Sequence, residues 1–163
     1  MKIFTHGKSV PWLFLILSLG ALAGCSNQEM NSNDYLLLMG ESSSWKLDEY
    51  EIEMTPESFL VGNGTIHMKN ENEYLTDFFH FETHAVISGE DTVIHSGSVS
   101  GSEIDITEET TGANEGAAHL NENGNPVRLD DISKIYMAIE WWNTDERKNV
   151  SEEIDLYSRS DGK

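Results

Sequence analysis

Three polar side chains in the segment 80–84 have the types and spacing that could hold a metal ion. Polar and apolar residues alternate through this segment, which predicts a β-strand. On a strand, side chains two residues apart lie on one face about 6.6–7 Å apart, so neighbours among His80, Glu82 and His84 could share a zinc ion. A complete site needs a further ligand, which the sequence does not identify. The alternative is a solvent-exposed strand face without metal.

A second candidate lies in the segment Asn121-Glu122-Asn123-Gly124-Asn125. Its side-chain oxygens are ligands of the kind that Ca²⁺ prefers, which makes Asn121, Asn123 and Asn125 candidate calcium ligands. The segment departs from the EF-hand loop, which requires glycine at its sixth position and glutamate at its twelfth. A β-turn centred on Asn-Gly accounts for the same residues equally well.

No motif for catalysis is present. The sequence contains no nucleophile elbow of the form G-x-S-x-G, no H-E-x-x-H and no glycine-rich phosphate loop. Carboxylate pairs cannot be singled out among 29 acidic residues, because any two could meet by chance. We therefore expect a protein that is not an enzyme and that has no cofactor.

The only cysteine, Cys25, follows an apolar N-terminal segment. Residues 1–8 carry two lysines and no acid, and residues 10–23 are almost wholly apolar. This layout is typical of a secretory signal peptide, and the apolar run is shorter than the roughly 20 residues that span a membrane. An ordinary signal peptide with a cysteine nearby is the alternative interpretation.

The four residues Leu22-Ala23-Gly24-Cys25 resemble the lipobox of bacterial lipoproteins. The resemblance implies cleavage between Gly24 and Cys25 and attachment of diacylglycerol to the Cys25 thiol. Two or three acyl chains, at about 0.8 kcal/mol per buried methylene, anchor a domain durably. It also implies a location at the cell membrane, on its extracytoplasmic face.

The composition bounds the partners. Residues 1–24 contain two of the 10 lysines and arginines and none of the 29 acidic residues, so the chain from Cys25 onward has a formal charge of −21. This charge argues against nucleic acid as a partner and against close contact of the folded domain with an anionic membrane surface. The expected partners are the membrane, through the lipid, and a protein of the envelope.

Four segments are expected along the chain. They are a signal peptide at 1–24, a flexible tether at 25–34, an acidic β-domain at 35–157 and a disordered tail at 158–163. The tether and the tail are polar and lack apolar periodicity, so neither has side chains to bury.

The domain shows a period of two. Tyr50, Ile52 and Met54 share one parity, whereas Trp45 and Leu47 have the other, which predicts a bulge near residue 48. Further strands are expected at 59–68 (with a break at 62–64), 79–87, 92–94 and 103–106, and as a hairpin at 135–141 and 150–156. A helix over 130–142 is the alternative to the first strand of this hairpin, but the β-branched and aromatic residues of the segment favour a strand.

Short strands separated by Gly, Asn and Asp predict an all-β fold, an antiparallel β-sandwich that is immunoglobulin-like or related, with a small β-barrel as the alternative. The segment 110–126 is expected to be a long loop, with a brief strand at 116–120 as the alternative for part of it, and loops of this length are often functional or mobile.

Three short motifs carry a wider resemblance: Gly40-Glu41-Ser42-x-x-Trp45-Lys46, Gly64-Thr65-Ile66 and Ile139-Glu140-Trp141. They resemble a group of small bacillus-type surface lipoproteins of uncharacterised function. The resemblance implies a Gram-positive surface lipoprotein with a β-sandwich and assigns no residue a role beyond the lipobox.

The expected function is therefore a membrane-anchored binding or interaction module, with the 110–126 segment and the strand edges as candidate surfaces. The alternative is an envelope protein that binds a small ligand or a cation such as Ca²⁺. An envelope hydrolase ranks third, because no group of catalytic residues supports it.

Overall fold

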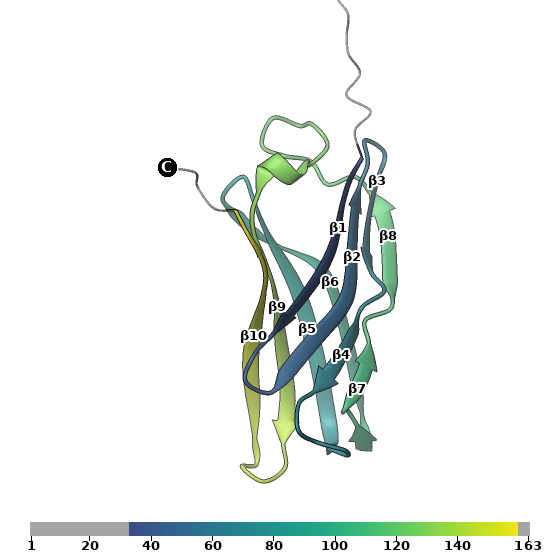
Figure 1. Cartoon of the computed structure of the whole chain (residues 1–163), viewed down its shortest axis with the longest axis vertical. Coiled ribbons are helices and arrows are strands. Elements are labelled where there is room, and N and C mark those ends of the chain that lie inside the picture. Colours follow the sequence, from purple (N-terminus) through teal and green to yellow (C-terminus); the bar gives the residue numbers. More distant parts are fainter. Residues whose placement is uncertain (1–32, 160–163) are drawn as a thin grey trace, which may run out of the picture. The chain divides into compact units, whose positions relative to one another are not determined.

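The computed structural model describes residues 33–159, which form two stacked antiparallel sheets (Figure 1). Neither sheet closes on itself in this part of the chain, so the expected all-β sandwich is confirmed and the barrel alternative is wrong. The expected signal peptide, the lipobox with Gly24 and Cys25, and all of the tether before residue 33 lie outside the described residues, as does most of the tail.

Sheet B contains four strands in the order β10-β9-β5-β6. They are β5 (Leu75–Ile87), β6 (Glu90–Asp105), β9 (Ile132–Asn143) and β10 (Lys148–Ser158). Alternate apolar side chains of β5 and β9 face the core, as the period of two predicts. The expected hairpin near the C-terminus is confirmed as β9–β10, and the segment 130–142 is a strand that follows a single 3₁₀ turn, η1 (Leu129–Asp131).

Sheet A contains six shorter strands. They are β1 (Asp34–Glu41), β2 (Trp45–Met54), β3 (Ser58–Gly62), β4 (Thr65–Met68), β7 (Glu108–Thr110) and β8 (Ala113–Ala117). β1 pairs with one edge of β2, while β3 and β4 pair with successive halves of its other edge. β8 then pairs with β3, and β7 pairs with β4. Beyond β2, the sheet therefore continues as two rows, each made of two short strands placed end to end: β3 with β4, and β8 with β7.

The predicted bulge in β2 is confirmed. The pairing of β1 with β2 shifts register between Leu38 and Gly40, where Asp48 and Glu49 on β2 stand opposite Met39 alone, so β2 has one extra residue. Glu49 takes a positive φ of 57°, which lets the strand change parity without leaving the sheet. Side chains on both sides of the bulge therefore reach the core.

Two expectations for the middle of the chain are wrong in part. The segment 110–126 is not one long loop, because its first part continues β7 and forms β8, which ends at Ala117. The two short strands expected at 92–94 and 103–106 are joined in the single strand β6. The serine- and glycine-rich residues 96–102 lie in that strand because the first five of them pair with β5, a contact that local propensity does not show.

The core lies between the sheets and centres on three aromatic rings. Trp45 packs 5.5 Å from Phe79 and 5.4 Å from Trp141, measured between ring centroids. All three side chains are buried, whereas Trp142 is only half-buried.

A carboxylate on β10 ties the two sheets together at one edge. Glu152 accepts hydrogen bonds from the hydroxyls of Ser42 and Ser44, at 2.6 and 2.7 Å, and from the Ser44 backbone N–H at 2.9 Å. Burial alone would raise the pKa of Glu152, but these hydrogen bonds outweigh it and lower the pKa. The turn between β1 and β2 is thereby fixed to sheet B.

Candidate functional site

The structure places His80, Glu82 and His84 on the outer face of β5, as predicted. The two carboxylate oxygens of Glu82 lie 3.3 Å from His80 Nε2 and 3.3 Å from His84 Nε2. Across residues 33–159, no three His, Cys, Asp or Glu side chains are arranged so that they could hold a metal ion. The three side chains are neighbours, but they pair with one another.

Contacts with the neighbouring strands β6 and β9 occupy the ring of His84 as well. Its Nδ1 lies 2.9 Å from Asp91 Oδ1, and its ring stacks on Tyr136 at 4.7 Å between centroids. Tyr136 donates a 2.6 Å hydrogen bond to Asp91, which lowers the pKa of Asp91 and raises that of Tyr136 to about 12. This face of sheet B is a surface network whose polar groups already have partners.

The asparagine segment 121–125 forms a turn, and hydrogen bonds within the turn occupy the side-chain oxygen of Asn121. Asn121 Oδ1 accepts hydrogen bonds from the backbone N–H groups of Asn123 and Asn125, both at 3.1 Å. Gly124 takes a φ of 77° and donates to the Asn121 carbonyl. These bonds are those of an Asx turn, so the turn interpretation accounts for Asn121.

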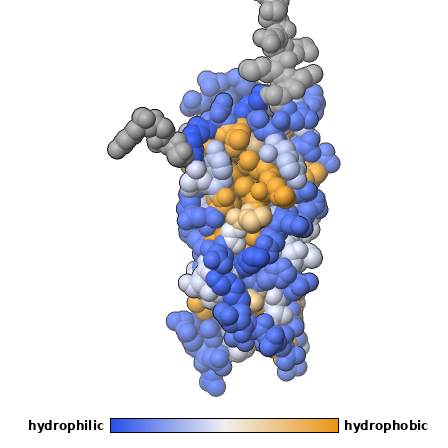
Figure 2. Space-filling model, viewed as in Figure 1, coloured by the Kyte–Doolittle hydropathy of each residue, from blue (hydrophilic) through white to orange (hydrophobic). Residues whose placement is uncertain are grey.

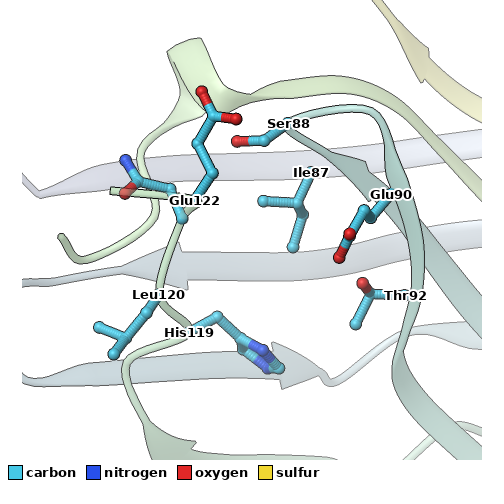
Figure 3. A pocket seen from close by; sticks show the side chains of 8 residues that line it. Ile87, Ser88, Glu90, Thr92, His119, Leu120 and Glu122 are labelled. Atoms are coloured by element: carbon cyan, nitrogen blue, oxygen red, sulfur yellow. The ribbon is translucent and has the colours of Figure 1, made fainter. Parts of the chain in front are cut away.

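A hollow of about 280 Å³ opens between the β5–β6 turn and the segment 119–122 (Figure 3). Ile87 lies at its centre, with Ser88, Glu90 and Thr92 from the hairpin on one side. The segment 119–122 closes the other side. The complete lining is Ile87, Ser88, Glu90, Thr92, His119, Leu120, Asn121 and Glu122.

Local contacts hold both walls of the hollow in place. The Ser88 N–H donates to Asp131 O at 2.8 Å, and the Val127 N–H donates to His119 O at 2.8 Å. The His119 ring packs edge-on against Phe59, with the centroids 4.7 Å apart. The segment 119–122 is therefore attached to the sandwich rather than free of it.

A second candidate surface is the outward row of β1, which we call the β1 face: Tyr35, Leu37 and Met39. Their side chains are 55%, 52% and 61% exposed, although two of the three are fully apolar. β1 is an edge strand of sheet A, and Figure 2 shows a hydrophobic patch over it on a mostly hydrophilic surface. An exposed apolar patch of this kind marks an interaction site more often than an isolated exposed side chain does.

Carboxylates border the β1 face. Glu53 lies opposite Tyr35 and Glu51 lies opposite Leu37 on β2, so both acids share the outer surface with the apolar row. Hydrogen bonds from Asn63 and Tyr35, at 2.6 and 2.8 Å, lower the pKa of Glu51. Glu51 therefore stays ionised at neutral pH.

Sequence reasoning named the 110–126 segment and the strand edges as candidate surfaces, but it identified neither the apolar row of β1 nor the hollow. The run from residue 35 to 39 is continuously apolar, although one face of a surface strand is normally polar, and this signals an exposed apolar row. The hollow has no comparable signal, because its two walls are about 30 residues apart in the chain and meet only in the fold.

Comparison with known proteins gives no relative: no family model, no curated protein and no solved structure matches the chain. Among residues 33–159, no helix has the length and apolar character needed to cross a bilayer.

Proposed function

We propose that this chain is a lipid-anchored protein on the extracytoplasmic face of the cell membrane, and that its β-domain is a binding module rather than an enzyme. The observation that carries the proposal is the β1 face, an exposed apolar row on an edge strand. β1 begins at Asp34, nine residues after Cys25, so the row lies on the first strand of the described residues.

The partner is a protein of the envelope whose docking segment carries apolar side chains flanked by Lys or Arg. The apolar residues would cover Leu37 and Met39, and the basic residues would pair with Glu51 and Glu53. The acidic border argues against the lipid surface as the occupant, because anionic headgroups would be repelled by it.

The test is photo-cross-linking of the lipidated protein in its own membranes, with the cross-linker at Met39 and mapping of the captured residues by mass spectrometry. We expect one protein, cross-linked through a segment that contains both apolar and basic residues. Leu37→Ser should abolish the cross-link, and the matched variant Val93→Ser, at a site 45% exposed on sheet B, should leave it intact.

Two results would contradict the proposal. Equal loss in Leu37→Ser and Val93→Ser would mean that the β1 face does not determine binding. An undiminished cross-link in Cys25→Ala, together with no diacylglycerol on the peptide that begins at Cys25, would remove the anchor from the proposal.

A further inference from the structure

We propose that the hollow between the β5–β6 turn and the segment 119–122 binds a small organic cation, an ammonium group on a short apolar stem. The site is separate from the β1 face, and the inference does not depend on the proposed function. It rests on the shape of the hollow, its charge and the hydrogen-bonding state of its side chains.

The shape fits a small molecule with an apolar part. The volume of about 280 Å³ lies just below the range of about 300–1,000 Å³ that is usual for ligand pockets. Ile87 is 7% exposed and forms an apolar floor, and Leu120, 63% exposed, adds an apolar rim. A short branched hydrocarbon stem would cover both side chains and remove their surface from water.

The charge selects a cation. Two carboxylates, Glu90 and Glu122, line the hollow from opposite walls, and neither lysine nor arginine is among its lining residues. An anion would be repelled, and a neutral ligand would leave both charges without a partner. An ammonium group offers up to three N–H donors and can form short, charge-assisted hydrogen bonds with carboxylates.

The hydrogen-bonding state also points to a ligand. Hydrogen bonds within residues 33–159 use none of the side-chain polar atoms of Ser88, Glu90, Thr92, His119 and Glu122. On the outer face of sheet B, by contrast, the side chains of His84, Asp91 and Tyr136 are hydrogen-bonded to one another. In the hollow, the hydroxyls of Ser88 and Thr92 and the His119 ring remain to bond a ligand.

A bare metal ion fits less well. Two carboxylates alone do not complete the coordination of Ca²⁺, which takes six to eight oxygen ligands. In the described chain, no third His, Cys, Asp or Glu side chain converges with them. The apolar floor would contribute nothing to a metal site. An organic cation uses both the carboxylates and Ile87.

The experiment is calorimetric titration of the full chain, in neutral detergent, with 3-methylbutylammonium and with its uncharged isostere 3-methylbutan-1-ol. We expect saturable binding of the amine and at least about tenfold weaker binding of the alcohol, since hydrogen bonds to charged groups contribute about 1.5–3 kcal/mol. Glu90→Gln and Glu122→Gln should each weaken amine binding about tenfold. The matched control is Glu115→Gln, an exposed carboxylate on β8, which should leave binding unchanged.

Three outcomes would overturn the inference. They are equal affinity for the amine and the alcohol, equal weakening by Glu115→Gln, and the absence of saturable amine binding. Displacement of the amine by CaCl₂, with an effect far above that of NaCl at equal ionic strength, would assign the carboxylates to a metal instead.

Discussion

At the scale of single residues, the most consequential buried pair is His95 and Tyr50. His95 is 7% exposed, and its Nδ1 lies 2.9 Å from the Tyr50 hydroxyl. The Phe81 ring packs edge-on against the imidazole, with the centroids 5.3 Å apart. Burial lowers the pKa of His95 and raises that of Tyr50, so the two neutral groups share one hydrogen bond.

This pair predicts a loss of stability on acidification. Because the pKa of His95 is lower in the folded chain, the unfolded chain binds a proton first as the pH falls below about 6.5. The free energy of unfolding should therefore decrease from that pH downward, by at most about 1.4 kcal/mol per pH unit for one proton, until the folded His95 also titrates. Urea unfolding between about pH 7.5 and 5 measures it.

The variant His95→Gln isolates this contribution, because the glutamine amide offers Tyr50 both a donor and an acceptor and does not titrate. We expect the pH dependence of the variant to be shallower than that of the wild type over the same range. Parallel curves for the two proteins would assign the acid sensitivity to other groups.

At the scale of elements, sheet A has a kink that runs across β2 and across the neighbouring breaks between β3 and β4 and between β7 and β8. Glu49 on β2, Asn63 between β3 and β4, and Gly112 between β7 and β8 all have positive φ, of 57°, 59° and 66°. The Asn63 N–H donates to Gly112 O at 2.6 Å, and the Thr111 N–H donates to Gly64 O at 2.9 Å. These two hydrogen bonds join the break between β3 and β4 to the break between β7 and β8. The sheet bends there while these backbone groups stay hydrogen-bonded.

Gly62 makes this kink possible and supplies the second prediction. Its φ is 126°, and a Cβ there would overlap Gly112 O and lie 2.7 Å from Ala113 Cα. Gly62→Ala should lower the free energy of unfolding by about 1–3 kcal/mol, because both backbone strain and overpacking oppose it. Equilibrium urea unfolding gives the difference.

Gly116→Ala is the matched control. Gly116 lies on β8, and a Cβ there would meet no atom within 4 Å. We expect an effect within about 0.5 kcal/mol for this exposed position. A Gly62→Ala protein as stable as the control would show that the kink can relax.

The sequence predicts the elements whose pattern is local. The parity change between Leu47 and Tyr50 gives the β2 bulge, and the alternation around Phe81 gives β5. It does not predict residues 96–102 as strand, and the brief strand expected at 116–120 overlaps only the last two residues of β8. Serine, glycine and alanine have little strand propensity, and pairing with β5 and β3 extends them there.

The candidate sites also divide into those with a local sequence pattern and those that depend on contacts between distant segments. The shared face of His80, Glu82 and His84 follows from a period of two, so it was predictable. That Glu82 and Asp91 would already be the partners of these histidines depends on the register between β5 and β6. The hollow needs two segments to meet across the fold, which no local pattern encodes.

At the scale of the whole molecule, the charge is the dominant feature. The chain carries 29 acidic and 10 basic residues, a formal charge of −19. Several cations are already paired at the surface, such as Lys134 with Asp155 at 2.9 Å and Arg128 with Asp34 at 2.8 Å. Most carboxylates therefore have no cation beside them, and their mutual repulsion opposes the folded state.

Salt should stabilise this protein. Raising NaCl from about 0.01 M to about 0.15 M shortens the screening length from about 30 Å to about 8 Å, which weakens repulsion between distant surface charges. We expect Tm to rise, by about 2–4 °C for each kcal/mol of repulsion removed, in thermal unfolding of the full chain followed by circular dichroism.

The double variant Glu73→Lys/Glu115→Lys tests the cause. Both side chains are exposed, and neither takes part in an ion pair of the described chain, so the change alters charge and little else. The variant should have a higher Tm than the wild type at low salt and a smaller rise with NaCl. If Tm instead falls with salt, attraction within the surface ion pairs outweighs the repulsion, and the excess of negative charge does not limit the stability of the fold.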